Sequence, residues 1–482
     1  MADLSLIRSG ARMTFRQQLS LTARLSVPAI LAQLSTIMMQ YIDASMVGRL
    51  SVEQSASVGL MNSSLWLFWG VCSTVTMGFS VQVAHSLGGG RQSEARDILR
   101  QGLTVCLLFG VFMALLGTAI SPWLPAWLGG SPEIRHDATV YFMTFVLALP
   151  MLILNYLAGG MLRCAGNMKI PGLLNVGMCV LDVFFNFFLI FPTRDVVVCG
   201  MPMTLPGAGL GVFGAALGTA GAECVCASAM LYYLLRRQPD LCLTGAHRRG
   251  SFRPTRRVLA KASKIAVPMT LEHIIFCGAQ IMITVIVAPL KGVAIAANAF
   301  AVTAESLCYM PGFGIGEAAT TLAGQSYGAG RYDLVRRFCH ITVGLGAVVM
   351  TVMGVIMYVA APFMMDVMTD IESISSLGAE CLRIEALAEP MYAVSIVAYG
   401  AFVGVGDTMI PAIMNFGSIW MVRIPLAAVL APTMGLIGVW VAMCIELVFR
   451  GLIFLWRMYS GAWLRHDRKK TEPVQSFGFP EE

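Results

Sequence analysis

Charged residues are scarce in this sequence. Asp, Glu, Lys and Arg make up 12% of the 482 residues, whereas hydrophobic residues make up 57% and the mean hydropathy is +0.73. Soluble domains carry about 25% charged residues, so this composition excludes an ordinary soluble protein. Apolar stretches of about 20 residues, the length of helix that crosses a bilayer, recur from end to end. We therefore expect an all-α membrane protein that crosses the lipid bilayer many times.

The sequence also lacks the motifs of several enzyme classes. It contains no Walker A sequence, no HExxH and no CxxC, and the GxGxxG pattern at residues 209–214 has no βαβ unit around it. The 13 cysteines lie mostly inside apolar stretches, where they are expected as small buried hydrophobic residues. We therefore expect no enzymatic activity, no cofactor and no metal centre, and a transport process driven by an ion gradient or by the solute itself.

Twelve membrane spans are expected from the apolar stretches. Lys and Arg gather in alternate connections, so the positive-inside rule predicts a cell-membrane protein with both termini in the cytoplasm. The net charge of +6 follows from this topology, and we expect no nucleic-acid partner. The expected parts are an N-terminal segment (1–24), a six-helix lobe (25–235), a basic linker (236–261), a second six-helix lobe (262–458) and a tail (459–482). The expected spans are 25–47, 57–84, 98–121, 138–160, 170–192, 210–235, 262–288, 295–322, 338–361, 382–404, 411–431 and 436–458.

The two halves of the chain repeat each other at a constant offset. Pro28 matches Pro268, and SLGGGR at residues 86–91 matches SYGAGR at residues 326–331, in each case 240 residues later (268 − 28 and 326 − 86). Six spans in each repeat leave both copies the same way up in the membrane. We therefore predict two parallel six-helix repeats around a central cleft.

A stripe of polar side chains follows the first span. Steps of three and four residues put Gln33, Thr36, Gln40 and Asp43 on one face of a helix. An ionisable side chain inside the membrane is costly against lipid and usually faces a protein interior or a water-filled cavity. We therefore expect this face to line a cavity.

The fifth span carries a second polar face, with Asp182 and Asn186 one turn apart. A carboxylic acid buried away from water binds a proton more readily, and carboxylate and amide oxygens also suit a small cation such as sodium. A third alternative is that Asp182 and Asn186 only hydrogen-bond neighbouring helices. The equivalent positions of the second half carry no acid, since Ile283 stands for Asp43 and Val422 for Asp182. We therefore expect the ion-coupling site in the first half.

The second half has polar positions of its own. Glu272 and Gln280 lie in the seventh span, and Glu389 and Tyr392 lie in the tenth. Some of these side chains are expected to attract a cationic substrate, and others to be structural; Glu272 lies close enough to the interface for its carboxylate to reach the headgroups. The side chains expected to line a substrate cleft are Gln33, Thr36, Gln40, Glu272, Gln280, Glu389 and Tyr392.

Several motifs occur together. Pro28 is followed 15 residues later (43 − 28) by Asp43, GGGR occupies residues 88–91, and the second half carries MPGFGIG at 310–316 and GQSYGAGR at 324–331. In these features the chain resembles the multidrug and toxic compound extrusion (MATE) family over essentially all its spans. The resemblance implies export of cationic or amphipathic organic drugs in exchange for protons or sodium ions. It also implies that Asp43 is the first-span acid of the N-terminal lobe and that Pro28 lets that helix bend.

Details of the resemblance point to particular residues and to a branch. Asn155 and Thr219 resemble the polar partners of the ion-coupling site in the fourth and sixth spans. Phe276 stands where the norfloxacin-exporter branch has a glutamate, so the chain is expected to be closer to the prokaryotic DNA-damage-inducible-type branch, although the order of Asp182 and Asn186 is reversed. We expect a monomer. The alternatives are a flippase for lipid-linked precursors, which needs a cationic cleft, and an intramembrane enzyme that uses paired carboxylates.

Overall fold

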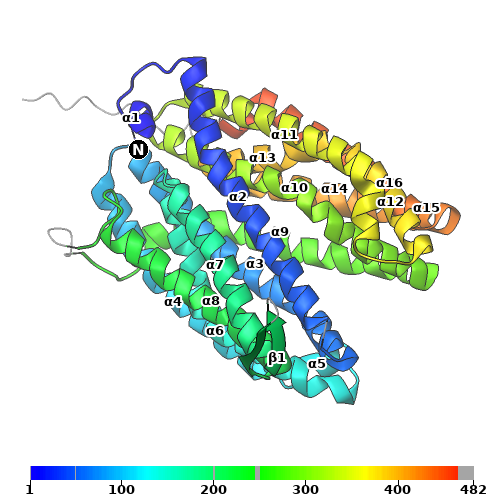
Figure 1. Ribbon diagram of the computed structural model, residues 1–482. Helices are drawn as coiled ribbons and strands as arrows, with labels where there is room; N and C mark the ends of the chain where they lie inside the picture. The colour runs from blue at the N-terminus through cyan, green and yellow to red at the C-terminus, as the bar shows by residue number, and fades with distance from the viewer. Residues whose placement is uncertain (1, 49, 199–200, 245–249, 465–482) are drawn as a thin grey trace, which may run out of the picture.

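Two helical bundles lie side by side in the molecule (Figure 1). The computed structural model describes residues 2–48, 50–198, 201–244 and 250–464, so most of the expected tail lies outside the described residues. Helices α2 to α8 form the first lobe and α9 to α16 the second. The helices are α1 (Ala2–Arg8), α2 (Phe15–Val47), α3 (Val52–Gly88), α4 (Gln92–Ile120), α5 (Leu124–Trp127), α6 (Pro132–Cys164), α7 (Lys169–Ile190), α8 (Gly211–Arg236), α9 (Arg256–Val287), α10 (Lys291–Gly328), α11 (Tyr332–Asp366), α12 (Glu372–Ala386), α13 (Glu389–Val405), α14 (Met409–Ser418), α15 (Ile424–Met434) and α16 (Leu436–Ser460).

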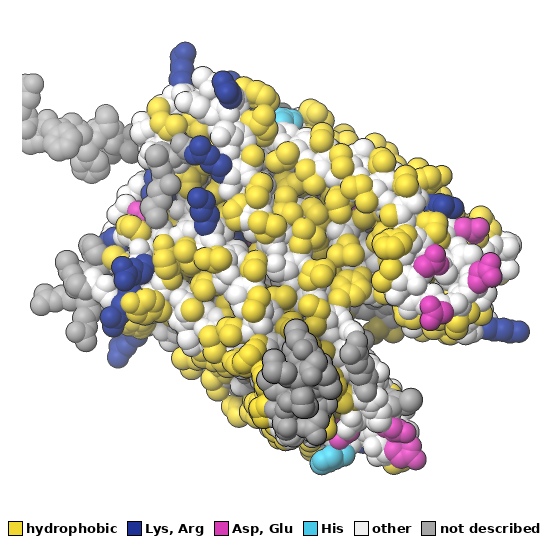
Figure 2. All heavy atoms as spheres, in the orientation of Figure 1, with side chains coloured by type: hydrophobic (Ala, Val, Ile, Leu, Met, Phe, Trp, Pro, Cys, Tyr) yellow, Lys and Arg dark blue, Asp and Glu magenta, His cyan; other side chains and the backbone are white. Residues whose placement is uncertain are grey.

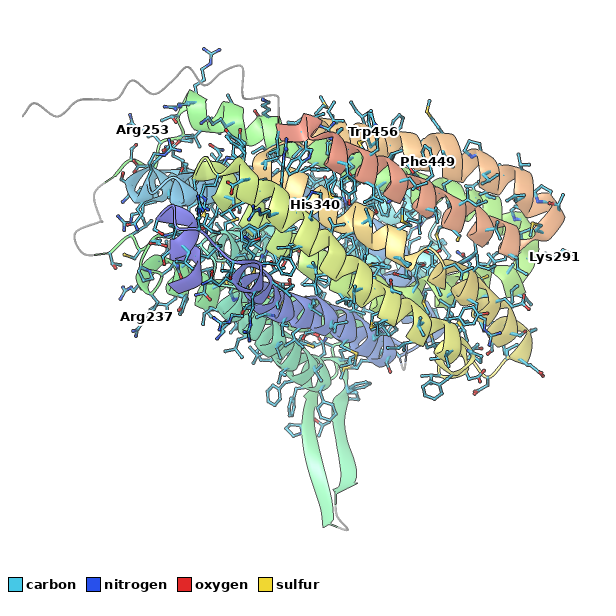
Figure 3. The ribbon with its side chains drawn as sticks, turned by 90° about the horizontal axis from the view of Figure 1, so that it is seen from above. Arg237, Arg253, Lys291, His340, Phe449 and Trp456 are labelled. Atoms are coloured by element: carbon cyan, nitrogen blue, oxygen red, sulfur yellow. The ribbon has the colours of Figure 1, made fainter. Side chains whose placement is uncertain are left out.

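The described helices account for the twelve expected spans. Ten helical stretches of the described residues are long and apolar enough to cross a membrane, or eleven when α12 and α13 count together as one bent span. One stretch contains both α9 and α10, which are separated by the 3-10 turn η2 (Ala288–Leu290). Arg253, before α9, and Lys291, at the start of α10, lie at opposite ends of the molecule (Figure 3). The predicted all-α membrane fold of two six-span repeats is therefore confirmed.

Two spans of the second lobe are interrupted. Helices α12 and α13 meet at an angle of 59°. Pro390, at the start of α13, has no N–H to donate and its ring would clash with the carbonyl of Ala386, so α12 ends there. The eleventh span contains the π-helical turn η3 (Ile419–Arg423) between α14 and α15. The helix expected over 382–404 is therefore corrected to a bent pair, whereas the span expected over 411–431 lies in one helical stretch, Met409–Met434, that contains this π-helical turn.

The connection after α7 is a β-hairpin. Its strands are β1 (Pro192–Val198) and β2 (Met201–Ala208), which pair antiparallel with Pro192 opposite Ala208. The run of three valines at residues 196–198 favours an extended strand because the side chains are β-branched. Hydropathy alone does not detect so short an element outside a span.

Each lobe has an apolar core of its own. Met61, Phe142 and Leu149 are fully buried in the first lobe, and Met357 and Trp440 in the second. Smaller apolar clusters also join the lobes, and one of them contains Leu25 and Ala29 of α2 together with Ala318 and Leu322 of α10.

The lobes meet at one end of the bundle, where Lys and Arg side chains gather (Figure 2). We call this the basic end; it carries the connections from α3 to α4, α6 to α7 and α10 to α11. A Cβ added at Gly88 would lie 2.0 Å from the Gln325 carbonyl oxygen, and one at Gly328 would lie 2.1 Å from the His85 carbonyl oxygen. Only glycine fits at these two crossings of α3 and α10. Toward the opposite end, where acidic side chains are visible, the lobes diverge (Figures 1 and 2).

Candidate functional site

Helix α2 lies between the two lobes and contacts both. Pro28 lies inside this continuous helix and leaves one turn without its N–H hydrogen bond. A glycine from each lobe packs against the same turn: a Cβ at Gly172 would lie 2.9 Å from the Pro28 carbonyl oxygen, and one at Gly314 would lie 2.6 Å from the Ile30 nitrogen. The weakest turn of α2 is therefore the turn that both lobes approach most closely.

Asp43, Asp182 and Asn186 meet inside the first lobe. The Asn186 side-chain nitrogen donates to Asp43 Oδ1 (2.8 Å) and to Asp182 Oδ2 (3.2 Å). The two carboxyl groups also contact each other. Asp182 and Asn186 are almost completely buried, whereas Asp43 is half-buried. The structure thus brings together the polar faces of the first and fifth spans, with Asp182 fully buried between the helices.

The cluster contains buried polar atoms without a partner. Asp182 Oδ1 and Asn186 Oδ1 accept no hydrogen bond, and two carboxylates in contact repel each other at low dielectric constant. A proton or a small cation shared by the two acids would give unpartnered oxygen atoms a partner and would reduce the repulsion between the carboxylates. Gly218 lets α8 approach this closely, since a Cβ there would lie 2.1 Å from Asn186 Oδ1.

Thr219 and Asn155 are placed differently from each other. Thr219 lies beside Asp182, and its hydroxyl donates to the Ala215 carbonyl of its own helix (3.2 Å). Asn155 does not bond to Asp182; its side-chain nitrogen donates to Glu223 Oε2 (3.0 Å). The site therefore includes Thr219 directly, and Asn155 only through a further acid.

Glu223 is a site residue that the sequence reasoning missed. It lies in α8 one turn after Thr219, so spacing of four residues was the signal that could have identified it. Helix α7 runs away from the basic end and α8 returns toward it, so Asp182 is one turn nearer that end than Asn186, and Glu223 one turn nearer than Thr219. Asp43, Asp182 and Glu223 thus form a row of acids that leads toward the basic end.

The remaining polar side chains of α2 do not form one surface. Gln33 donates to Glu317 Oε1 of α10 (3.3 Å), and Arg163 of α6 lies 3.6 Å from Glu317 Oε2. Thr36 donates to the Ala32 carbonyl of its own helix (3.0 Å). Gln40 is half-buried. Gln33 therefore belongs to a junction between the lobes, which ties α2 to the second lobe.

The polar residues of the second lobe divide into three environments. Glu272 accepts hydrogen bonds from the Tyr399 hydroxyl (2.6 Å) and the Asn415 side chain (2.5 Å), so its carboxylate is held inside the lobe rather than reaching for the interface. Gln280 and Tyr392 line a cavity of about 370 Å³. Glu389 is completely buried and does not line this cavity, and neither of its carboxylate oxygens has a hydrogen-bond partner.

A buried ion triad lies beside the second-lobe cavity, and its two arginines are part of the cavity lining. Glu446 lies between Arg423 and Arg450, with nitrogen–oxygen distances of 2.7 Å to each, and also accepts a hydrogen bond from Ser418. The triad holds both arginines in ion pairs with one glutamate, which leaves one positive charge in excess, and it is a structural element of the lobe.

The comparison with known proteins relates both halves to one family. The MatE family model matches residues 28–188 and 268–429, whose starts are 240 residues apart (268 − 28). The probable multidrug resistance protein NorM of Thermotoga maritima is 25% identical over 461 residues, which cover 94% of this chain and 95% of the relative. The probable multidrug resistance protein NorM of Mesorhizobium japonicum is 27% identical over 504 residues and covers 98% and 100%. A crystal structure of MATE in complex with MaL6 has the same fold, with a TM-score of 0.86 at 20% identity over 98% of this chain and 100% of the other.

These relatives do not support the predicted branch. Both carry the name NorM, which points to the norfloxacin-exporter branch rather than to the DNA-damage-inducible-type branch. The prediction rested on a few positions, chiefly Phe276, which stands in place of a glutamate, and the pair of Asp182 and Asn186. A single side chain is replaced more easily than the packing of the helices around it. Similarity over the whole chain is therefore stronger evidence for the branch than these few positions.

Proposed function

The chain belongs to the MatE family, and we propose that it is a secondary antiporter that exports cationic or amphipathic organic compounds in exchange for protons or sodium ions. Support for this substrate class comes from the multidrug resistance proteins that it resembles over nearly their whole length. It acts by alternating access as a monomer in the cell membrane, with both termini in the cytoplasm.

The observation that carries the proposal is the contact between Asp43 and Asp182 through Asn186. The acids come from α2 and α7, so a proton or sodium ion bound between them changes how α2 packs on the first lobe. When its carboxylates are ionised, the pair attracts a cationic substrate. When the pair has bound the coupling ion, this attraction is lost. Because the coupling ion must bind the two conformations with different affinity, the carboxylates differ in burial between them.

The positive-inside rule places the basic end in the cytoplasm. The lobes are joined at that end, through contacts such as Gly88 with Gln325, and diverge at the other. We therefore infer an outward-facing state, in which Asp43, on the outer half of α2, takes up the driving ion. Bending of α2 at Pro28 connects this event with the junction at Gln33 and Glu317.

A vesicle assay tests this function. The purified protein in liposomes is supplied with a fluorescent organic cation and with an imposed pH gradient, an imposed sodium gradient, or neither. We expect substrate movement against its own gradient with one of the two ion gradients, which also identifies the coupling ion. Substrate movement that is independent of both ion gradients would contradict the proposal. Chemical turnover of a substrate in detergent would favour an enzyme instead.

The arginines of the second-lobe cavity do not favour a flippase. Arg423 and Arg450 both bind Glu446, and Glu305 lies in the same lining. An anionic lipid-linked precursor would need cations that are not already held in ion pairs with an acid. Drug export is therefore the function that the site favours.

Glu223→Gln is expected to slow coupled export by roughly tenfold or more, because a positioned proton-transferring group contributes at least this much to a rate. Glu223 is the acid next to Asp182 on the way to the basic end, and glutamine keeps the hydrogen bond with Asn155 while removing the titratable group. Initial rates in the vesicle assay measure the effect. Glu94→Gln, at an exposed acid of α4, is the matched control. An unchanged rate in Glu223→Gln would exclude the residue from proton transfer.

A further inference from the structure

A polar stripe on α10 lies at the seam between the lobes, near the basic end. Glu317, Thr321 and Gln325 follow one another in steps of four residues and share one face of α10. Arg163, at the end of α6 in the other lobe, has its Nε 3.6 Å from Glu317 Oε2. The Thr321 hydroxyl donates to the Arg163 carbonyl (3.3 Å). The Gln325 side-chain nitrogen donates to the Cys164 carbonyl (2.6 Å). The stripe therefore joins the second lobe to the end of a first-lobe helix, where carbonyl groups lack donors within their own helix.

The repeat places an apolar copy of this stripe on α3. The residues 240 positions earlier (317 − 77 and 321 − 81) are Met77 and Val81, and Val403 of α13 stands 240 positions after Arg163 (403 − 163). Val81 and Val403 are buried in one apolar cluster, and Met77 packs against it. The lobes therefore meet at two equivalent contacts, of which one contains an ion pair and the other has apolar side chains at the same positions.

One turn further along, the two contacts are alike. A ring nitrogen of His85 lies 2.8 Å from the carbonyl oxygen of Gly404 in the other lobe. His85 is the repeat equivalent of Gln325 (325 − 85). Gly404 is the repeat equivalent of Cys164 (404 − 164). Each lobe thus contributes one side chain that bonds to a helix end of the other, so the two contacts differ in the ion pair and not in these bonds.

The polar contact is easier to open than the apolar one. The side chains of Arg163 and Glu317 are 19% and 28% exposed, so water replaces their interaction when the lobes separate. A pair with this exposure changes an equilibrium by about fivefold at most. Separation of Val81 from Val403 instead exposes buried apolar surface to water, which is unfavourable in proportion to the area exposed. An opening of the basic end therefore starts between α6 and α10, with the contact of α3 and α13 as its hinge.

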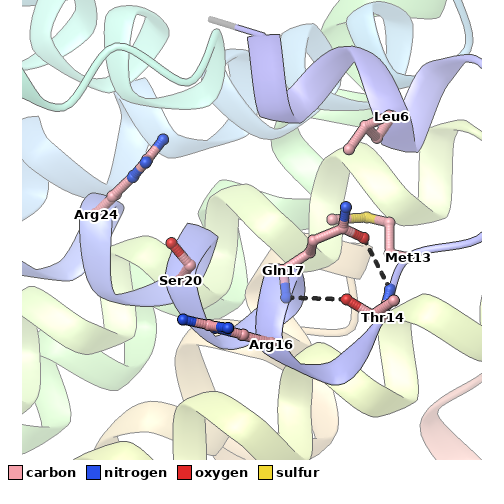
Figure 4. A pocket seen from close by; sticks show the side chains of 7 residues that line it. All are labelled: Leu6, Met13, Thr14, Arg16, Gln17, Ser20 and Arg24. Atoms are coloured by element: carbon pink, nitrogen blue, oxygen red, sulfur yellow. Dashed lines mark hydrogen bonds between the residues drawn. The ribbon is translucent and has the colours of Figure 1, made fainter.

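Helix α2 is attached to the same ion pair. The Gln33 side-chain nitrogen donates to Glu317 Oε1 (3.3 Å). The first turn of α2 is fixed by a capping pair, in which Gln17 N donates to Thr14 Oγ1 (3.4 Å) and Thr14 N donates to Gln17 Oε1 (2.9 Å) (Figure 4). Pro28 lies between this turn and Gln33. A bend at Pro28 therefore moves Gln33 relative to Glu317 and changes the hydrogen bonds of the carboxylate in the ion pair.

We propose, on the basis of the antiport function proposed above, that the ion pair of Arg163 and Glu317 is the latch of the cytoplasmic gate. It holds α6 against α10 while the protein faces outward. The basic end opens by separation of these two helices, while Val81 and Val403 stay packed. When binding of the coupling ion bends α2, Gln33 leaves Glu317 and the latch loosens. A contribution of about fivefold is enough for this role, because the conformations of such a protein differ by a small free energy.

Hydrogen exchange of the purified full-length protein in detergent, followed by mass spectrometry, tests the latch without an ion gradient or a substrate. The variant Glu317→Gln removes the charge and keeps an acceptor for Gln33. We expect exchange at the end of α6 to become up to about fivefold faster in this variant, and exchange at the end of α13 to stay unchanged. The control Glu94→Gln breaks an exposed ion pair within the first lobe at the same end and should change exchange at neither helix end.

A charge exchange provides the second test. Arg163→Glu combined with Glu317→Arg restores the pair, and Gln33 can bond to either residue because its amide both donates and accepts. We expect the double variant to exchange hydrogen at the wild-type rate, whereas Arg163→Glu alone places two acids together and exchanges faster. An unchanged α6 end in Glu317→Gln, an equal change at both helix ends, or a folded double variant without the wild-type rate would each overturn the proposal. Because the measurement needs no transport, these outcomes are independent of the vesicle assay that tests the antiport.

Discussion

Asp43→Asn is expected to abolish ion-coupled export while leaving the protein folded. Asparagine has the size of aspartate and can still bind the Asn186 side chain, which lies 2.8 Å from Asp43 Oδ1. It cannot carry a proton or the negative charge that attracts a cation. We expect the initial rate of gradient-driven transport to fall by roughly a hundredfold, as for loss of a positioned acid–base group.

The measurement for Asp43→Asn is uptake of a fluorescent organic cation into liposomes under the gradient that drives the wild type. Asp370→Asn is the matched control, since Asp370 is an exposed acid on the connection between α11 and α12, far along the chain from the cluster. Size-exclusion elution and thermal stability establish that both variants are folded. Undiminished transport by a folded Asp43→Asn protein would exclude the pair of aspartates from coupling.

Glu446→Gln is expected to have the largest effect on stability. Glu446 is completely buried and is the shared partner of Arg423 and Arg450, both about 7% exposed. Glutamine leaves two buried guanidinium groups without the carboxylate that they share, and removal of one partner from a buried ion pair costs about 3–5 kcal/mol. We expect a sharply lowered melting temperature or loss of the folded protein from the membrane fraction.

The control for the triad is the exposed pair of Arg91 and Glu94, which are 3.1 Å apart with side chains 57% and 36% exposed. Such surface pairs contribute about 0–1 kcal/mol, so Glu94→Gln should leave the melting temperature nearly unchanged. A Glu446→Gln protein as stable as the Glu94→Gln protein would show that the cavity hydrates the arginines well enough to replace the glutamate.

Helical periodicity predicted which side chains share a face, but not which faces meet. Asp182 and Asn186 are four residues apart, so their common face followed from the sequence. Asn155 was grouped with them, yet it binds Glu223, because the packing of α6 on α8 turns its amide away from α7. Glu389 was placed in the cleft, but the bend between α12 and α13 buries it within the lobe.

The sequence by itself determined the membrane class, the twelve spans and the repeat, because hydropathy and a constant offset are properties of the chain alone. The tertiary structure decided whether residues at equivalent positions of the two repeats have the same effect on their helices. Pro150 and Pro390 are equivalent in the repeat, 240 residues apart (390 − 150), yet α6 passes through Pro150 unbroken whereas α12 ends before Pro390. A proline weakens a turn wherever it stands, but whether the helix breaks there depends on the neighbouring helices that hold the freed carbonyl and the bend in place.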